Sequence, residues 1–304
     1  MASPNHLLID GDILLYNTTS ACKHEADWGD AFVTVWFDKK EFTALIDTIL
    51  SRWCRKFDTE DFTICLSDYH DPFRKRIDPT YKEQREGNAK PTGYQWAHET
   101  LPDMYPCSSM PSLEADDVMG IMSTSGMFER PIIISEDKDM RQIPGTLYVP
   151  RRDELVEITP HEGYRYHMLQ TLVGDRVDNY PGCRGIGEVR AERILASAAA
   201  AQLDFWVATV RAYRQSKQGD EFALRQARLS KILQYEDYDF EQQEPILWTP
   251  STNVPSSDAT TVDTKSPQEP SAATSKNGTP APTPGSPRPT PQPPLRSTSR
   301  LRKR

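Results

Sequence analysis

Short apolar runs separated by turn residues dominate the first half of the chain. They occur at residues 7–9, 62–66, 132–134 and 147–149. Runs of this length, bounded by turn residues, are typical of buried strands. Between them apolar residues recur at helical spacing, most clearly at Phe42, Leu45, Ile46, Ile49, Leu50 and Trp53. We interpret that stripe as the core-facing side of a helix. The alternation predicts an α/β fold with a central, mostly parallel sheet flanked by helices.

The pattern changes in the second half of the chain. From residue 168 to about residue 234 strand signals disappear and helix-forming residues dominate. We therefore expect an α/β domain over residues 1–167, which includes a basic segment at 69–95, and a helical domain over 168–250. No internal repeat is apparent.

Residues 251–304 have a different composition from the rest. They hold eleven of the 25 prolines and no aromatic residue. Such a segment cannot bury enough apolar surface to form a core, so we expect a disordered tail rich in Pro, Ser and Thr. A solvated tail with no specific partner is favoured over weak, salt-dependent contact with a polyanion.

Composition excludes several classes of protein. No apolar run approaches the ~18 residues of a membrane span, and the start of the chain lacks the basic and apolar regions of a secretory signal. The five cysteines are odd in number and contain no CxxC pair, which argues against a disulfide framework or a zinc site. We expect a cytoplasmic protein with free thiols.

Charge is distributed unevenly along the chain. The formal net charge is −8, but residues 1–250 carry 28 basic and 41 acidic side chains, whereas residues 251–304 carry eight basic and three acidic ones. An acidic body usually repels nucleic acid. That conclusion fails if many of the carboxylates surround bound cations, so their positions matter more than their sum.

Carboxylates follow three of the predicted strands. They are Asp10 and Asp12 after the first strand, Asp68 after the second, and Asp137 and Asp139 after the third. A single acid in a loop is usually a solubilising residue. Three parallel strands, however, deliver their carboxyl ends to one edge of a sheet, where ligands bind. We expect these side chains to converge.

Two further groups of acids have helical spacing. Glu114, Asp116 and Asp117 lie in the first turn of a predicted helix. Three acidic residues are more than a favourable interaction with the helix N-terminus requires. Asp175 and Asp178 stand three residues apart in GDRVDN. As many as ten carboxylates could therefore share one site.

Clustered carboxylates cannot all ionise unless cations neutralise them. All-oxygen ligands favour Mg²⁺, Mn²⁺ or Ca²⁺, and the absence of clustered His or Cys argues against zinc. Two divalent ions ~3.5 to 4 Å apart suit in-line displacement at phosphorus. Metal-dependent phosphoester chemistry is the leading prediction.

Two segments indicate a nucleic-acid substrate. FRKRIDPTYKEQREGNAKPTGY, residues 73–94, interleaves six basic residues with two tyrosines, which suits phosphate neutralisation and base stacking. A solvated mobile loop explains that composition equally well. PGCRGIGEVRAERIL, residues 181–195, places three glycines before a helix, where backbone N–H groups can approach a phosphate. From these segments we expect DNA contacts at Arg74, Tyr81, Lys82, Arg85, Gly182, Arg184, Gly185, Gly187 and Arg190.

The ordered set IDGD, CLSD, PTYKEQR, LEADD, ISEDKD and LVGDRVDNYPGCRGIG resembles the 5′ nucleases, the family of flap endonucleases and 5′→3′ exonucleases of bacteriophages. The resemblance runs from about residue 7 to 250, and residues 226–250 resemble the end of the stand-alone exonucleases of T-odd phages. It implies the PIN-like fold of that family, with a helix-three-turn-helix in the helical half. The proline-rich tail has no counterpart there.

The resemblance also implies roles by position. The first Mg²⁺ would be held by Asp10, Asp68, Glu114 and Asp116, with Asp117 close by. The second would be held by Asp137, Asp139, Asp175 and Asp178. Lys82 and Arg85 would be the basic pair of a helical arch that contacts the scissile phosphate. The glycines would bind duplex phosphates through a potassium ion. Asp12 stands where many members have a hydroxyl residue.

These expectations combine into one hypothesis and two alternatives. The hypothesis is a monomeric, Mg²⁺-dependent 5′→3′ exonuclease and flap endonuclease, with Mn²⁺ as a substitute, that acts on DNA with 5′ ends, nicks or flaps, and on RNA in RNA–DNA hybrids. The first alternative is a phosphatase of the haloacid-dehalogenase type that uses Asp10 and Asp12, with Ser67 binding the phosphoryl group. The second is a non-catalytic binder of DNA ends.

Overall fold

The computed structural model describes residues 5–85, 87 and 89–250. The tail expected over 251–304 lies outside them. Within the described residues the core is a six-stranded sheet in the order β5-β4-β1-β6-β7-β8. Its strands are β1 (Asn5–Asp10), β4 (Phe62–Cys65), β5 (Cys107–Ser108), β6 (Arg130–Ile134), β7 (Gly145–Val149) and β8 (Glu154–Ile158). All neighbouring strands are parallel except β7 and β8. The four strands predicted from apolar runs are confirmed.

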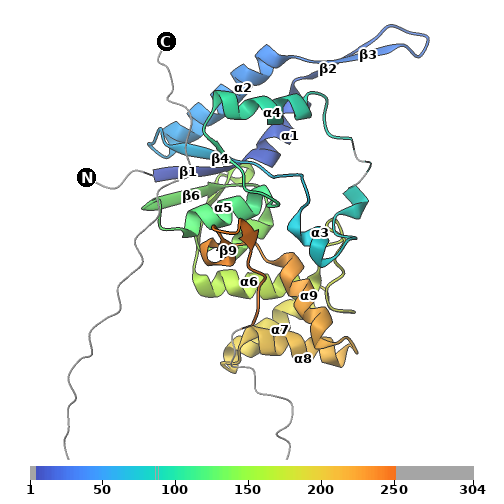
Figure 1. The fold of residues 1–304 in the computed structure, drawn as a ribbon, viewed down its shortest axis with the longest axis vertical. Helices are drawn as coiled ribbons and strands as arrows, with labels where there is room; N and C mark the ends of the chain where they lie inside the picture. The colour runs from blue at the N-terminus through green and yellow to red at the C-terminus, as the bar shows by residue number, and fades with distance from the viewer. Residues whose placement is uncertain (1–4, 86, 88, 251–304) are drawn as a thin grey trace, which may run out of the picture. The chain divides into compact units, whose positions relative to one another are not determined.

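Helices cover both faces of this sheet (Figure 1). The helices of the described residues are α1 (Gly11–Ala21), α2 (Lys39–Lys56), α3 (Phe73–Ile77), α4 (Tyr94–Met104), α5 (Ala115–Thr124), α6 (Pro160–Val173), α7 (Glu188–Ala200), α8 (Phe205–Gln215) and α9 (Asp220–Ser230). Short 3-10 turns are η1 (Glu83–Arg85), η2 (Lys138–Gln142), η3 (Pro150–Arg152) and η4 (Tyr235–Asp237). The predicted α/β class is thereby confirmed.

Alternation along the strands divides the core into two layers. Leu7 and Ile9 of β1 pack in one cluster with α1, α2 and α4, and that cluster includes the predicted stripe residues Phe42, Ile46 and Trp53. Leu8 packs in the opposite cluster with α5 and η2. Because successive side chains of a strand point to opposite faces, a sheet buried on both sides needs continuous apolar strands.

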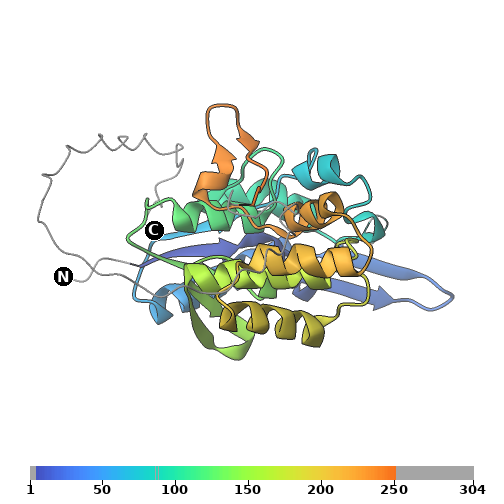
Figure 2. The ribbon, with the colours of Figure 1, turned by 90° about the horizontal axis from the view of Figure 1, so that it is seen from below.

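The second half is helical as predicted. Helices α6 to α9 enclose a cluster of their own around Leu172, Leu195 and Tyr213. The expected boundary at 167/168 falls inside α6, which runs unbroken from Pro160 to Val173. In Figure 1 α6 lies nearest the sheet and α7 and α8 lie beyond it, whereas Figure 2 shows these helices from below, in front of the sheet.

Two small hairpins complete the described chain. One joins β2 (Lys23–Asp27) to β3 (Val33–Phe37), and the other joins β9 (Tyr238–Asp239) to β10 (Glu244–Pro245). The β2–β3 hairpin projects from the body in Figure 1 and exposes Trp28 and Phe32 at its turn.

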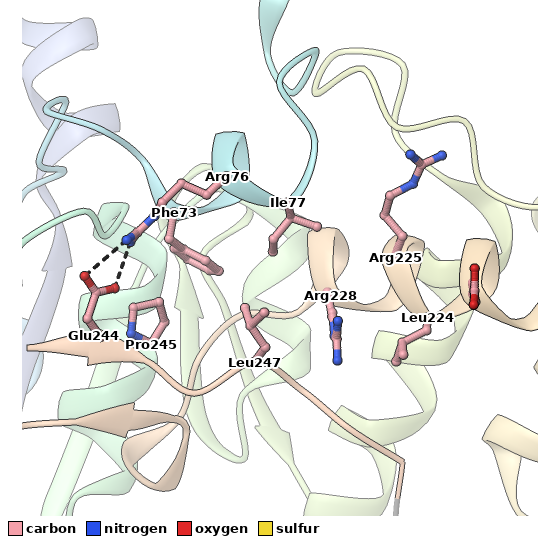
Figure 3. Close-up of a pocket in the computed structure, with 10 residues that line it drawn as sticks. Phe73, Arg76, Ile77, Leu224, Arg225, Arg228, Glu244, Pro245 and Leu247 are labelled. Carbon is pink, nitrogen blue, oxygen red and sulfur yellow. Dashed lines mark hydrogen bonds and ion pairs between the residues drawn. The ribbon is translucent and has the colours of Figure 1, made fainter. Parts of the chain in front are cut away.

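The last described segment lies along a groove of about 540 Å³ between α3 and α9 (Figure 3). Arg76 of α3 pairs there with Glu244 of β10, and Arg228 of α9 donates to the Trp248 carbonyl oxygen. These contacts fasten residues 244–248 to the body. Across residues 5–85, 87 and 89–250, no helix is both long and apolar enough to cross a membrane.

Candidate active site

The predicted carboxylates gather at the carboxyl ends of β1, β4 and β6. We call the group formed by Asp10, Asp12, Glu114, Asp116, Asp137, Asp139, Asp175 and Asp178 the acidic edge. Asp10 ends β1 and caps α1, where it accepts from the Ile13 amide at 3.0 Å and from the Ser135 hydroxyl at 2.7 Å. Ser135 also accepts from the Asp137 amide at 3.0 Å, so one hydroxyl joins the ends of β1 and β6.

Burial, reinforced by mutual repulsion, raises the pKa of several of these acids. Burial, with contributions from Asp12 and Asp137, raises the pKa of Asp10 to about 7. Burial and Asp137 raise the pKa of Asp139 to about 7, and burial with Asp137 and Asp10 raises that of Asp116. These couplings show that acids from separate parts of the sequence face one another, as the strand-end argument predicts.

Basic side chains neutralise the other end of the acidic edge. Lys82 forms ion pairs with Glu114 and, at 3.8 Å, with Asp178, while Arg85 pairs with Asp178. Burial would raise the pKa of Glu114, but Lys82 and Arg74 outweigh it and lower that pKa to about 2. Burial raises the pKa of Asp178 in spite of Lys82 and Arg85.

The donor set suits divalent cations. Among the described residues, Asp139 Oδ1 is buried without a hydrogen-bond partner. Burial and repulsion raise the pKa values of Asp10 and Asp139, and a bound cation would offset both effects. All candidate ligands are carboxylate oxygens. Within the described part of the chain, no three Asp, Glu, His or Cys side chains are arranged closely enough to bind one metal ion together. Two of the acids, Glu114 and Asp178, are paired with Lys82 and Arg85.

Asp117 holds two parts of the chain together. It is fully buried, and both oxygens accept from Arg74, at 2.6 and 2.8 Å. It also accepts from the Leu233 amide at 3.1 Å. With both oxygens engaged, Asp117 holds α5 to the chain after α9. The expectation that Asp117 lies close to the first metal stays a prediction.

Arg74 and Tyr81, expected to contact DNA, are buried instead. Arg74 is 3% exposed, and each guanidinium nitrogen donates within the protein, to Glu114 and Asp117 and to the carbonyl oxygens of Leu229 and Lys231. Tyr81 is 3% exposed, and its hydroxyl donates to Glu114 at 3.0 Å. Neither side chain is accessible to DNA, because the acids of α5 draw both into the interior.

Asp68 stands apart from the coupled acids. Its two oxygens accept from the backbone amides of His70 and Ser112 at 2.9 and 3.0 Å. It lines a pocket with Tyr69 and His98. The structure therefore places Asp68 at the end of the site, with its carboxylate ordering the loop after β4.

Ser67 and Asp12 form a contact that the sequence did not reveal. The Ser67 hydroxyl donates to Asp12 Oδ2 at 2.5 Å and accepts from the Ala115 amide at 2.9 Å. It thus ties the first turns of α1 and α5, which carry Asp12 and Asp116, to the end of β4. A serine before an acid at a strand end was the available signal, and Ser135 before Asp137 repeats it.

The glycine turn lies between α6 and α7. Gly174 and Gly182 have φ of +73° and +64°, and their backbones pack together so closely that a Cβ on either would come within 2.4 Å of the other's nitrogen. The Gly182 amide donates to Gln226, so this glycine shapes the turn. Gly185 and Gly187 face open space, and Arg184 and Arg190 beside them are exposed. These four residues form an accessible surface suited to phosphate contact.

Comparison with known proteins agrees with this arrangement. Residues 5–162 match the family model for the 5′-3′ exonuclease N-terminal resolvase-like domain. The exodeoxyribonuclease of Enterobacteria phage T3 is 26% identical over 282 residues, covering 80% of this chain and 92% of that protein. The exonuclease of Escherichia phage T7 is also 26% identical over 282 residues, covering 80% and 93%.

Solved structures show the same fold. The phage T5 5′-exonuclease with bound zinc ions has a TM-score of 0.54 at 17% identity, covering 74% of this chain and 89% of that one. The T5 flap endonuclease in a pseudo-enzyme-product complex with DNA and metal ions has a TM-score of 0.55 at 17% identity, covering 75% and 89%. These comparisons give no support to the phosphatase alternative. The chain therefore belongs to the 5′→3′ exonuclease family and is a nuclease.

Proposed function

We propose that the protein hydrolyses DNA phosphodiesters at 5′ ends and at the base of 5′ flaps, with two Mg²⁺ ions as the natural cofactors and Mn²⁺ as a substitute. The observation that carries this proposal is the acidic edge, which lies between a basic segment and an open glycine turn. Carboxylates that could bind metal ions therefore lie next to basic side chains that could bind a phosphate and to a surface that could bind duplex DNA.

The acids divide between two ion positions in this proposal. Asp10, Glu114 and Asp116 would hold one ion, with Asp68 at its rim, and Asp137, Asp139, Asp175 and Asp178 would hold the other. When bound, such ions lower the pKa of a water nucleophile and stabilise charge on the leaving oxygen. The products would carry a 5′-phosphate and a 3′-hydroxyl.

The remaining residues position the substrate. Lys82 and Arg85 would exchange their carboxylate partners for the scissile phosphate once cations neutralise Glu114 and Asp178. Gly185 and Gly187, flanked by Arg184 and Arg190, would bind the duplex backbone, with K⁺ as a bridging ion. We further expect cleavage of RNA in RNA–DNA hybrids, and action as a monomer in the cytoplasm of a phage-infected or bacterial cell.

Product sizing on a duplex with a labelled 5′ flap tests the function. With Mg²⁺ we expect short products released from the 5′ side, and with EDTA none. Asp137→Ala and Asp116→Ala should abolish cleavage while DNA binding in Ca²⁺ persists. Full turnover by both variants would overturn the ligand proposal. Tight binding of DNA by the wild type without any product would favour the non-catalytic DNA-end binder.

A further inference from the structure

A pocket of about 670 Å³ lies beside the acidic edge, where β4 and β5 end. Ser67 and Asp68 join it to the site described above, and its remaining residues have no role there. The side chains that define it are those of Tyr69, Lys90, Tyr94, His98 and Met110. It is thus an additional cavity next to the reaction centre.

Three rings form one wall of this pocket. The centroids of Tyr69 and His98 are 5.3 Å apart, and those of Tyr94 and His98 are 6.3 Å apart in a stacked arrangement. The hydroxyls of Tyr69 and Tyr94 are hydrogen-bonded at 2.8 Å, and His98 Nε2 lies 3.2 Å from the Ser67 carbonyl oxygen. Tyr94 is buried, whereas Tyr69 is 46% exposed. Tyr69 is therefore a supported ring with accessible surface, as a base-stacking platform must be.

Lys90 supplies the charge of the pocket. Its Nζ lies 3.3 Å from the centroid of Tyr69 and 4.3 Å from that of Tyr94. Within the described residues no carboxylate forms an ion pair with it. Burial lowers its pKa, and the charge of Asp12 acts in the opposite direction. An ammonium whose partners among the described residues are aromatic rings can readily exchange them for a phosphate.

The position of the pocket indicates which nucleotide could enter it. Asp68, Asp10 and Asp137 follow the neighbouring strands β4, β1 and β6. Asp175 and Asp178 lie on the loop that leads into the glycine turn, and in addition to burial their charges raise the pKa of Asp139 after β6. The glycine turn is therefore on the side of the acids away from Asp68. Suppose that the DNA duplex lies on the glycine turn. The DNA strand that crosses the acids then reaches the Tyr69 pocket on the side away from the duplex, where this strand is unpaired.

We propose that this pocket binds the first unpaired nucleotide on the 5′ side of the cleaved bond, with its base stacked on Tyr69 and its phosphate bound by Lys90. The inference rests on the proposed nuclease function and names the nucleotide that the site selects. Lys90 must leave the ring face as the base arrives, so base and cation exchange places. Because the pocket takes an unpaired nucleotide, it favours DNA substrates whose 5′ end can unpair.

Fluorescence of 2-aminopurine, placed as the first unpaired base of a flap substrate, tests the proposal. Titration in Ca²⁺ allows binding without relying on turnover. We expect strong quenching with wild-type protein, loss of quenching and roughly tenfold weaker flap binding with Tyr69→Ala, and retention of quenching with Tyr69→Phe. Lys90→Gln should weaken binding of a flap with this phosphate but not of one with a neutral methylphosphonate there. Tyr235→Ala is the matched control, because Tyr235 is 43% exposed but lies outside the pocket.

The outcomes separate the pocket from the nuclease function. Two results would contradict the pocket proposal even if the wild type cleaves normally. One is equal quenching with Tyr69→Ala and Tyr235→Ala. The other is that Lys90→Gln weakens binding of the phosphate flap and of the methylphosphonate flap equally. Failure of the wild type to cleave in Mg²⁺ overturns the proposed function while the quenching result in Ca²⁺ still decides the pocket. Circular dichroism of each variant shows whether it is folded, and the Lys90→Gln comparison between the phosphate and the methylphosphonate flap decides the result if Tyr69→Ala is unfolded.

Discussion

At the residue scale, one buried ion pair links several parts of the molecule. Arg74 of α3 binds Glu114 and Asp117 at the start of α5 and two carbonyl oxygens at the end of α9. A buried pair adds little net stability relative to apolar residues, but removal of one partner leaves an uncompensated charge. Its role is therefore to fix the position of α5, which carries Glu114 and Asp116.

Arg74→Met should consequently be strongly destabilising. We expect a loss of about 3 to 5 kcal/mol in the free energy of unfolding, because Asp117 stays buried without its partner. The matched control is Arg76→Met in the same helix, where the pair with Glu244 is surface-exposed and the loss should stay below ~1 kcal/mol. Urea unfolding of both variants gives the comparison. Equal losses would contradict the structural role of Arg74.

Ser67 is predicted to position metal ligands without binding a metal. Ser67→Ala breaks the link between Asp12 and the Ala115 amide, so the acids on α1 and α5 lose their alignment. We expect the Mg²⁺ concentration for half-maximal cleavage to rise roughly tenfold, with the rate largely recovered at saturating Mg²⁺. Ser123→Ala in α5, whose hydroxyl bonds only within its helix, is the control. An unchanged Mg²⁺ requirement in Ser67→Ala would refute this role.

Lys82 should act on the rate more than on affinity. Its ammonium is held by Glu114 and Asp178 at the acidic edge, so it can strengthen its phosphate contact as charge develops in the transition state. Lys82→Ala should lower kcat by roughly 100-fold while the Kd for flap DNA in Ca²⁺ changes little. Lys56→Ala, which removes an exposed pair with Asp153, should change neither quantity. A loss confined to Kd would make Lys82 a docking residue.

At the scale of elements, backbone geometry separates the glycines that the sequence grouped together. Gly182 has positive φ and touches Gly174, whereas Gly187 has φ of −97° and precedes α7 in open space. The first shapes the turn, and the second leaves room for a ligand. Glycine spacing alone could not distinguish these roles, since the contact depends on where α6 ends.

Alanine at these two positions should therefore act differently. Gly182→Ala places a Cβ 2.4 Å from the Gly174 nitrogen and forces a non-glycine residue into positive φ, which should cost at least about 2 kcal/mol of unfolding free energy. Gly187→Ala should leave stability within ~0.5 kcal/mol but weaken duplex binding, because the new methyl stands where a phosphate would approach. Urea unfolding and DNA titration in Ca²⁺ measure the two effects. Wild-type stability in Gly182→Ala would disprove the account of the turn.

Secondary structure was predictable to different degrees across the elements. The apolar strands β1, β4, β6 and β7 and the helix stripe of α2 were identified because they are buried. The β2–β3 hairpin was missed, since every residue of β3 but one is exposed and no buried face imposes a pattern. The partly exposed edge strand β8 was missed for a related reason.

At the scale of the whole molecule, the acidic edge couples stability to pH and to cations. Asp10 and Asp139 have pKa values of about 7, above their ordinary value of 3.8. The folded state therefore binds protons more readily than the unfolded state between these values. Taken alone, these groups make the metal-free protein more stable as the pH falls from 8 towards 4. Buried His167 acts in the opposite direction, because burial lowers its pKa to about 3 and disfavours the folded state below its ordinary pKa.

Mg²⁺ should consequently stabilise the protein more at pH 8 than at pH 5.5. At a 100-fold excess over its Kd the ion should raise Tm by roughly 5 to 10 °C at pH 8, and by much less at pH 5.5, where protons already relieve the repulsion. Thermal unfolding with and without Mg²⁺ at both pH values provides the measurement. Asp139→Asn, which lacks one of the repelling charges, should reduce the difference. A Mg²⁺ effect independent of pH would contradict the electrostatic account.

The sequence by itself determined the fold class, the strand-end acids and the order of motifs, because burial imposes local periodicity and short motifs keep their chemistry along the chain. Only the tertiary structure decided the role of each side chain. By residue type alone, a buried charge or ring cannot be told from an accessible one. Contacts with the start of α5 and with the chain after α9 bury Arg74, Tyr81 and Asp117. Tyr69 and Lys90 meet Tyr94 and His98 only because the loop after β4 lies beside the start of α4. Such pairings depend on residues distant in sequence, and no local pattern records them.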